Sequence, residues 1–340
     1  MAGDAFAAGA AESRCVTNRS SVASLPAVRL LTGPAREQAV KQDGVATTAQ
    51  LATWGFSRSL VARRVRSGEW QRVFQGVVAL QSGPISWRQR ARAALLYTGP
   101  GAALSHRSAA YVREVLTSPG PEVHVTVPHV RTVMPQRGLV VHRRRTMPWA
   151  GGGLRAVEAG DALVCLVAQA RSDDEVVGLL CDAVRAGVHP DDVLERAGRW
   201  RRLRNRRLLL EVLGAVADGI ESPLEYRYRR DVERAHGLPR ATAQKRERVG
   251  GRWIRADRVY VRYHVRVELD GQLAHPFGTT DDDVWRDNAV LIATGDITLR
   301  YRWRHVAVTP CQSALQAVGA LRSRGWQGRP HPCRPGCPVR

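Results

Sequence analysis

Helix-capping residues and glycines alternate so regularly between residues 47 and 80 that this segment is restricted to few folds. Thr47 begins a capping box that opens one short helix, and Gly55 is placed to end it. Ser57 is placed to cap a second helix, which Gly68 ends. The spacing therefore predicts two short helices joined by a turn.

Two β-rich runs follow the second helix, from Trp70 to Phe74 and from Gly76 to Leu80. They are close enough in the sequence to form a hairpin. Helix, turn, helix and hairpin is the order of a winged helix-turn-helix domain. In that domain the second helix enters the major groove of DNA while the hairpin contacts the backbone. We therefore expect a winged-helix domain over residues 36–82.

Arginine is concentrated in the same part of the chain. Eight arginines and one acidic residue, Glu69, lie between residues 56 and 92. On the second helix, Val61 and Val65 lie one turn apart and are expected to face the core, so the arginines point elsewhere. The side chains predicted to bind DNA are Arg58, Arg63, Arg66 and Arg72. The alternative is that these arginines form the solvated face of a small helical domain.

The whole chain carries an excess of positive charge. Its 340 residues include 52 basic and 31 acidic side chains, which give a formal net charge of +21. Such a charge favours polyanions such as DNA or RNA, because binding releases condensed counterions. Lys41 and Lys245 are the only lysines, and an arginine bias of this kind also arises from compositional drift.

About forty residues of the predicted winged helix resemble the N-terminal domain of AbiEi-type antitoxins. The resemblance is carried by Gly44-Val-Ala-Thr-Thr-Ala-Gln-Leu, Gly55-Phe-Ser-Arg, Arg66-Ser-Gly-Glu-Trp-Gln-Arg-Val and Gly76-Val-Val-Ala-Leu. It implies double-stranded DNA as a partner, transcriptional autoregulation within a type IV toxin–antitoxin pair, and a cognate toxin. It supports DNA binding more strongly than it supports an antitoxin role.

Two strands are predicted near the C-terminus, from Trp253 to Val261 and from Tyr263 to Asp270. Strict alternation in the second strand places Val265, Val267 and Leu269 on one face of a sheet. The opposite face then carries Arg266, Glu268 and Asp270. Two carboxylates and a guanidinium are therefore expected to point the same way.

Asp257 approaches the same surface if the two strands pair antiparallel, and His275 follows the second strand closely. Carboxylates gathered in this way are costly unless a cation neutralises them. A bound Mg²⁺ would activate water for hydrolysis of a DNA phosphodiester, with no small-molecule cofactor. The alternative is structural: Glu268 and Asp270 pair across the sheet with Arg255, Arg258 and Arg266.

Residues 221–325 resemble the restriction-endonuclease-type fold of very-short-patch-repair (Vsr-like) endonucleases. The resemblance is carried by Glu221-Ser-Pro-Leu-Glu225, Gln244, Arg255-Ala-Asp257, Val267-Glu-Leu-Asp-Gly-Gln-Leu-Ala-His275, Trp285-Arg-Asp-Asn288, Gly295 and Leu299-Arg-Tyr-Arg-Trp303. It implies a mixed sheet flanked by helices and an endonuclease activity. Carried over residue by residue, it makes Asp257 and Asp270 the metal ligands. The catalytic set that it implies is Glu225, Asp257, Glu268, Asp270 and His275.

Two features depart from the nuclease pattern. The general motif ends in lysine where this chain has Asp270, and Arg266 is a poor general base, so His275 would have to take that role. Glu225 is also the third residue of a helix that Ser222 is placed to cap, so capping explains it as well as catalysis does. Two functions stay open: a metal-dependent DNA endonuclease, or a non-catalytic transcriptional regulator of the AbiEi antitoxin type.

These patterns predict an α+β protein of several domains. The expected parts are a disordered extension at 1–35, the winged helix at 36–82, an α/β middle domain at 83–198, an Arg-rich helical linker at 199–220, the Vsr-like domain at 221–325 and a Pro-rich tail at 326–340. The clearest apolar run, Ala162 to Ala168, is far shorter than the roughly 18 residues of a membrane span. The N-terminus lacks a signal-peptide pattern, so we expect a cytoplasmic protein with no membrane partner.

Histidines and cysteines show no complete metal-binding spacing. The histidines of the middle region are His106, His124 and His142. No motif connects them, and histidines on alternating strands are usually structural. His331, Cys333 and Cys337 form a local cluster, but a zinc site usually needs a fourth ligand and a folded knuckle, which a Pro-rich tail is not expected to supply. The six cysteines are therefore expected to be free thiols.

Overall fold

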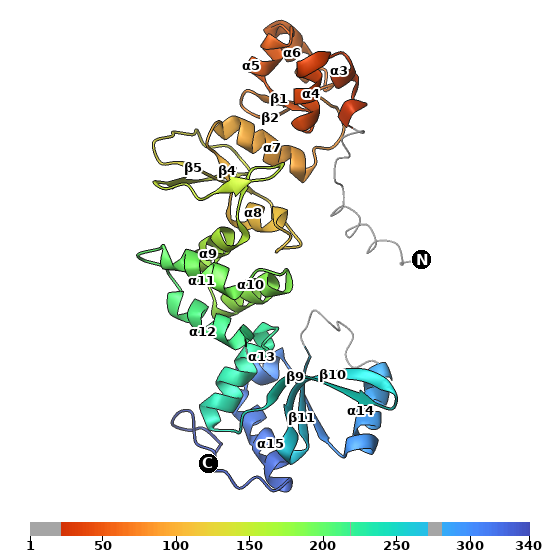
Figure 1. Ribbon diagram of the computed structural model, residues 1–340, viewed down its shortest axis with the longest axis vertical. Helices are drawn as coiled ribbons and strands as arrows, with labels where there is room; N and C mark the ends of the chain where they lie inside the picture. The colour runs from red at the N-terminus through yellow and green to blue at the C-terminus, as the bar shows by residue number, and fades with distance from the viewer. Residues whose placement is uncertain (1–21, 218, 271–280) are drawn as a thin grey trace. The chain divides into compact units, whose positions relative to one another are not determined.

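The computed structural model describes residues 22–217, 219–270 and 281–340, and these form a mixed α and β protein with three sheets (Figure 1). The chain divides into two compact units. The first comprises Met1–Gln169 with Arg185–Arg204, and the second comprises Ala170–Val184 with Asn205–Arg340. No helix in the described ranges is both long enough and apolar enough to cross a membrane.

Short helices and a three-stranded antiparallel sheet of order β1-β3-β2 form the N-terminal head of the first unit. Its elements are α3 (Pro26–Arg29), α4 (Gly33–Lys41), β1 (Val45–Thr47), α5 (Thr48–Thr53), α6 (Arg58–Arg66), β2 (Gln71–Phe74) and β3 (Val77–Ala79). The predicted caps are confirmed. The Thr47 hydroxyl accepts from the Gln50 N–H at 3.1 Å, and Gln50 Oε1 accepts from the Thr47 N–H at 2.9 Å. The Ser57 hydroxyl accepts from the Leu60 N–H at 3.2 Å.

The core of the head is small and partly aromatic. Leu51, Val61 and Trp70 are buried, and Val65 packs against them from a half-buried position. The Phe56 and Trp70 rings meet edge to face at 5.4 Å. The inward valines of α6 confirm the helical spacing read from the sequence, and they turn the opposite side of this helix towards solvent.

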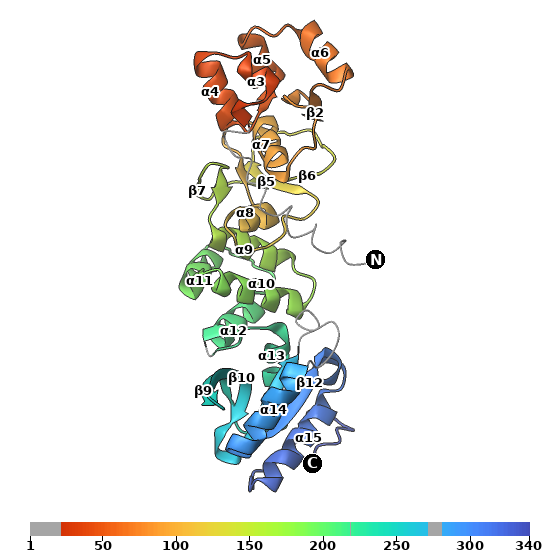
Figure 2. The same ribbon diagram turned by 90° about the vertical axis from the view of Figure 1, so that its right-hand side faces the viewer.

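A five-stranded sheet of order β6-β5-β4-β8-β7 forms the middle of the first unit. Its elements are α7 (Trp87–Thr98), β4 (Ala103–Leu104), α8 (His106–Val112), β5 (Val123–Pro128), β6 (Leu139–Arg144), β7 (Ala150–Gly151), β8 (Ala156–Val157), α9 (Ala159–Gln169) and α11 (Pro190–Gly198). Helices α7 and α8 pack against β5, and α9 packs against α8 and α11 (Figure 2). This region therefore contains both helices and strands.

The Arg-rich stretch from residue 199 to residue 207 is not a continuous helix. Helix α11 ends at Gly198, and α12 (Arg206–Ala217) begins at Arg206. Asn205 has a φ of 61°, outside the helical range. Arginines three and four residues apart would repel one another along a helix. The expected helical linker is therefore helical only from Arg206 onwards.

A four-stranded sheet of order β12-β11-β10-β9 organises the second unit, with β11 and β12 parallel and the other neighbours antiparallel. The elements are α10 (Asp173–Arg185), α12, α13 (Pro223–Arg227), the π-helical turn η2 (Tyr228–Glu233), the 3₁₀ turn η3 (Arg234–His236), β9 (Thr242–Val249), β10 (Arg252–Tyr260), the 3₁₀ turn η4 (Val261–Tyr263), β11 (Val265–Asp270), α14 (Asp281–Thr294), β12 (Ile297–Arg302), the π-helical turn η5 (Arg304–Val308) and α15 (Pro310–Ser323). Val265, Val267 and Leu269 enter a core with residues of η2 and α15, as their alternation predicts. The sequence does not predict β9, because polar and charged residues fill most of it.

Candidate nucleic-acid interface and carboxylate cluster

The four arginines predicted to bind DNA are exposed side chains of the head. Three lie on α6 and one on β2: Arg58, Arg63, Arg66 and Arg72. None of them makes an ion pair with a carboxylate in the part of the chain that the structure describes. Free guanidinium groups on the second helix and on the hairpin are placed where a winged helix contacts phosphates and base edges.

Neighbouring arginines of the head are already paired. Arg64 forms an ion pair with Glu69, and hydrogen bonds from Arg64 and a nearby serine hold the pKa of the Glu69 carboxyl below its usual value. Arg88 and Arg92 bind the two oxygens of buried Asp43 at 2.8 and 3.1 Å. These pairs join α7 to the head. The local charge therefore separates into arginines that stabilise the domain and arginines that face solvent.

Two of the predicted catalytic carboxylates meet at Gln244 in the second unit. The Gln244 Nε2 amide donates to Glu225 Oε2 at 2.9 Å and to Asp257 Oδ1 at 3.4 Å. The other oxygen of Asp257 accepts from the Leu269 backbone N–H at 2.8 Å. Gln244 has a φ of 49° and interrupts the pairing of β9 with β10. This uncommon backbone conformation is compensated by the two bonds that the amide makes.

Glu225 serves as a helix cap and also belongs to the cluster. The Ser222 hydroxyl accepts from the Glu225 N–H at 3.2 Å, and Glu225 Oε2 accepts from the Glu221 N–H at 3.2 Å. Ser222 is therefore confirmed as the N-cap, whereas the Glu225 carboxylate bonds the backbone N–H of the residue before the cap. Burial raises the pKa of the Glu225 carboxyl, and the nearby Asp257 raises it further. Capping therefore accounts for the position of Glu225 without removing it from the carboxylate cluster.

Glu268 and Asp270 differ in how their charge is balanced. Burial raises the pKa of Glu268 to about 7, and the charge of Asp257 adds to this effect. Burial raises the pKa of Asp257 as well. Asp270 is half-buried, and Arg300 Nη1 lies 3.3 Å from both of its oxygens. Glu268 and Asp257 thus leave an excess of negative charge inside the cluster. Asp270, at the edge of the cluster, is paired with Arg300.

The arginines proposed as structural partners for Glu268 and Asp270 bind other carboxylates. Arg255 pairs with Glu221 at 3.1 Å. Arg258 pairs with Glu233, and Arg266 pairs with Glu247 and Asp296. The structural alternative is therefore wrong in its choice of partners, because strand alternation and helix packing direct these guanidinium groups elsewhere. His275 lies outside the described residues.

The carboxylate cluster suits a hard cation by its chemistry, but it is not gathered tightly. Two groups of three or more His, Cys, Asp or Glu residues have ligand atoms within 4.8 Å of one another in the described ranges, and neither group includes these carboxylates. Mg²⁺ prefers oxygen ligands at about 2.1 Å. A cation bound by Asp270 would have to compete with Arg300, which contacts both oxygens of this carboxylate.

The two groups that do converge were not predicted from the sequence. The first contains His106, His124 and His142, whose rings stack, with 3.6 Å between the centroids of His106 and His142. Burial lowers the pKa of His106 to about 2 and that of His142 to about 4, so both are neutral at physiological pH. The second contains His236, Cys311, Cys333 and Cys337. The sequence indicated only Cys333 and Cys337 of the second group; spacing could not identify the remaining ligands, because they lie on separate elements.

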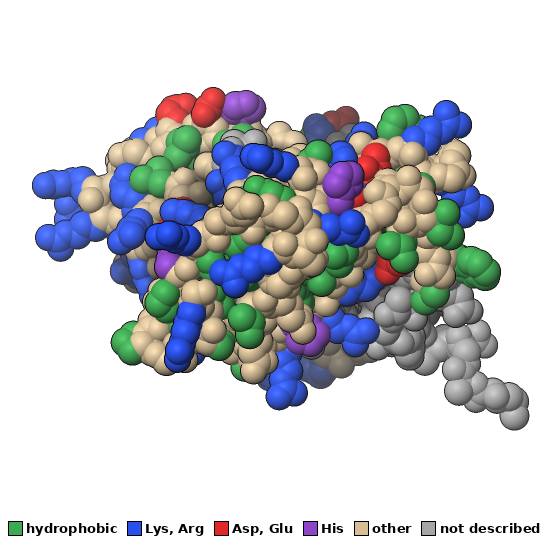
Figure 3. Space-filling view, turned by 90° about the horizontal axis from the view of Figure 1, so that it is seen from below, with side chains coloured by type: hydrophobic (Ala, Val, Ile, Leu, Met, Phe, Trp, Pro, Cys, Tyr) green, Lys and Arg blue, Asp and Glu red, His purple; other side chains and the backbone are tan. Residues whose placement is uncertain are grey.

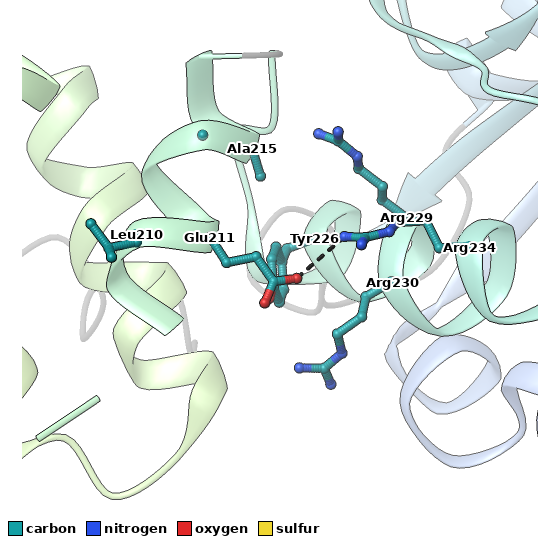
Figure 4. A pocket seen from close by; sticks show the side chains of 8 residues that line it. Leu210, Glu211, Ala215, Tyr226, Arg229, Arg230 and Arg234 are labelled. Atoms are coloured by element: carbon teal, nitrogen blue, oxygen red, sulfur yellow. Dashed lines mark hydrogen bonds and ion pairs between the residues drawn. The ribbon is translucent and has the colours of Figure 1, made fainter. Parts of the chain in front are cut away.

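A cleft of about 280 Å³ lies between α12 and the α13–η3 segment of the second unit (Figure 4). Glu211 points across it and pairs with Arg234 at 3.3 Å. Arg230, on the same side, is held by Asp173 at 2.8 Å and by Asp231 at 2.7 Å. Because carboxylates already balance these arginines, the cleft is a weaker anion site than the face of α6.

Helix, turn, arginine-bearing helix and hairpin follow one another in the head, which is the element order of a winged-helix domain. Residues 36–81 match the family model of transcriptional regulators described as AbiEi antitoxin. The match lies within the head and ends before the five-stranded sheet begins. Over these residues the N-terminal part of the chain is similar to AbiEi antitoxin-type regulators. No curated protein matches the chain.

Proposed function

We propose that this protein is a duplex-DNA-binding transcriptional regulator of the AbiEi antitoxin type. The observation that carries the proposal is the row of unpaired, exposed arginines on α6, inside the segment that matches the AbiEi family. Helix α6 would enter the major groove, and Arg72 on β2 would contact the phosphate backbone as a wing does. The regulatory role implies a cognate toxin as a further partner.

The charge on the face of the protein drawn in Figure 3 also supports binding to duplex DNA. Lys and Arg side chains predominate over Asp and Glu on the face drawn in Figure 3. A basic surface of this kind raises the encounter rate with DNA and adds affinity that does not depend on sequence. Specific recognition would still rest on α6, since base contacts need side chains that reach the groove.

The test is the salt dependence of duplex binding by the full chain, measured by fluorescence anisotropy. Arg63→Ala/Arg66→Ala should make the slope of log K against log salt shallower by about two, because two phosphate contacts are lost. The matched control is Arg29→Ala/Arg36→Ala, which removes the same charge from exposed positions on α3 and α4. Equal slopes for the two double variants would refute α6 as the recognition helix.

A second candidate function is metal-dependent hydrolysis of DNA by the carboxylate cluster. The observation that favours it is that Gln244 joins Glu225 to Asp257, and that burial raises the pKa of these two carboxyls and of Glu268, on which the charge of Asp257 also acts. A divalent cation held by Asp257 and Asp270 would relieve that repulsion and supply a Lewis acid. Arg300 would stay bound to Asp287 at 2.7 Å through Nε and Nη2, and its Nη1 would then be available to a phosphate oxygen.

Plasmid nicking in Mg²⁺ or Mn²⁺ tests the hydrolytic function. Wild type is compared with Asp257→Asn/Asp270→Asn, which keeps the shape of both side chains and removes the charge that a metal needs. Cleavage by wild type alone, abolished by a chelator, is the expected result. If both proteins nick equally, or neither does, hydrolysis by the carboxylate cluster is refuted.

A further inference from the structure

Four metal-ligating side chains from three separate parts of the second unit converge at its C-terminal end. His236 ends η3, Cys311 lies in the first turn of α15, and Cys333 and Cys337 belong to the segment that follows α15. The His nitrogen and the three sulfurs all lie within 4.8 Å of one another. His236, Cys311 and Cys337 are buried, whereas Cys333 is exposed. The arrangement is the donor set of a Cys₃His site.

The imidazole of His236 is oriented as a metal ligand. Its Nδ1 lies 3.1 Å from the Val232 carbonyl oxygen, which fixes the proton on Nδ1. The side chain is fully buried, and its Nε2 has no hydrogen-bond partner in the described part of the chain. A buried nitrogen lone pair without a donor is costly unless something binds it. The three sulfurs lie within 4.8 Å of the ligating nitrogen of this ring.

The sulfur positions fit tetrahedral coordination better than a disulfide. Sγ of Cys311 and Sγ of Cys333 are 3.5 Å apart. A disulfide requires about 2.05 Å, whereas two thiolates bound at about 2.3 Å to one tetrahedral Zn²⁺ are about 3.8 Å apart. Zn²⁺ has no redox chemistry and favours sulfur and nitrogen ligands. Mg²⁺, which prefers oxygen, does not suit this set.

The tail forms a short folded knuckle around its two cysteines. Cys333 and Cys337 are separated by three residues, a spacing within the usual range for zinc ligands. Gly336 has a φ of 78°, which lets the chain turn back, and the Cys337 N–H donates to the Arg334 carbonyl at 3.1 Å. The His331 N–H donates to the His236 carbonyl at 3.1 Å, so the tail is aligned with η3. Val339 is fully buried in the core of this unit.

We propose that His236, Cys311, Cys333 and Cys337 bind one structural Zn²⁺. Each thiol releases its proton to solvent on binding, and three thiolates with a neutral imidazole around Zn²⁺ leave one net negative charge. The ion ties the tail and α15 to the helical segment that begins at Ser222 and carries Glu225. It therefore stabilises the scaffold behind the carboxylate cluster without taking part in DNA binding by the head.

Metal content of the full-length protein tests the site. The chain is purified with a reductant, stripped by a chelator, supplied with Zn²⁺ and gel-filtered before elemental analysis. Wild type should retain about one Zn²⁺ per chain, and Cys333→Ser at least tenfold less, since loss of a ligand exceeds the roughly 10- to 100-fold effect of an outer-shell change. Cys181→Ala is the matched control, because Cys181 is a buried cysteine of the same unit outside the group. It should retain the metal.

The absorption spectrum of the cobalt-substituted protein tests the metal ligands independently of the stability of the protein. Co²⁺ bound by three thiolates should show strong sulfur-to-metal charge-transfer absorption in wild type and in Cys181→Ala, and a weaker band in Cys333→Ser. Cys333 is exposed, so circular dichroism of that variant should match wild type. Reduced wild type that retains no zinc, or a Cys333→Ser variant that retains as much as wild type, overturns the proposal. A Cys311–Cys333 disulfide in the reduced, zinc-supplied protein does the same.

Discussion

On α6, Arg58, Arg63 and Arg66 are exposed and have no carboxylate partner in the described ranges, whereas Arg258 and Arg266 of the C-terminal sheet are 2% and 1% exposed and are ion-paired. Every one of these arginines contributes the same unit charge to the net charge of the chain. Only the first set can reach a phosphate. The distribution of arginine between surface and core, and not the total charge of +21, therefore decides which part of the protein is available to a polyanion.

The two regions also differ in how they are stabilised. The head uses local caps at Thr47 and Ser57 around a small core. The C-terminal sheet contains buried ion pairs, whose removal from water costs several kcal/mol per ion and is repaid only if the partner stays. Buried ion pairs and local caps are therefore expected to differ in how much stability is lost when one partner is removed.

Removal of one partner of a buried pair should have the largest effect. Arg258→Met leaves Glu233, which is 3% exposed, without its guanidinium. We expect a loss of about 3–5 kcal/mol in the free energy of unfolding, measured by urea denaturation. Arg258→Met/Glu233→Gln should recover part of it, because no buried charge is left unpaired. If Arg258→Met loses no more free energy of unfolding than the exposed Arg66→Met, the buried and the exposed arginines do not differ in their contribution to stability.

Acid should destabilise the first unit through its buried histidines. Burial lowers the folded pKa of His106 and His142 below the usual 6.5, so the unfolded chain takes up protons first as pH falls. Stability is therefore fully present above pH 6.5 and falls between about pH 6.5 and 4, by up to about 1.4 kcal/mol per pH unit for each proton. His142→Gln should make this slope shallower in pH-dependent denaturation. The exposed His129→Gln should leave it unchanged.

Loss of a local cap should cost less than loss of a buried pair. Thr47→Ala removes the capping box of α5 and should lower the stability of the head by about 1 kcal/mol. Thr32 occupies the same position before α4 but makes no side-chain capping bond. Thr32→Ala is therefore the matched control and should have a smaller effect in thermal denaturation. Equal losses would mean that the capping bond contributes little.

The smallest effect on stability is expected for the exposed arginines. Arg58→Ala should change the free energy of unfolding by less than about 0.5 kcal/mol and still reduce the salt slope of DNA binding by about one. Arg255→Ala, at an exposed position of β10 paired with Glu221, should leave the slope unchanged. A shallower slope for Arg255→Ala would show that the sheet also contacts DNA.

Local chemistry allowed much of the fold to be predicted. Thr47, Ser57 and Ser222 cap the helices that their positions indicate, because capping depends on residues within one turn. The alternation of Val265, Val267 and Leu269 identified the apolar face of β11, because side chains alternate strictly along a strand, although Arg266 and Glu268 on the other face are buried as well. These features need no information about distant residues.

Contacts between distant segments were decided only by the tertiary structure. Gln244 joins Glu225 to Asp257 because an irregular residue in β9 faces β10, and strand register cannot be read from composition. The ligand groups around His106 and His236 assemble from elements that share no motif. Sequence determined which residues carry charge, caps and apolar faces, since these are local properties. Packing determined which arginines are neutralised and which histidines and cysteines meet, because those depend on how separate elements are placed in space.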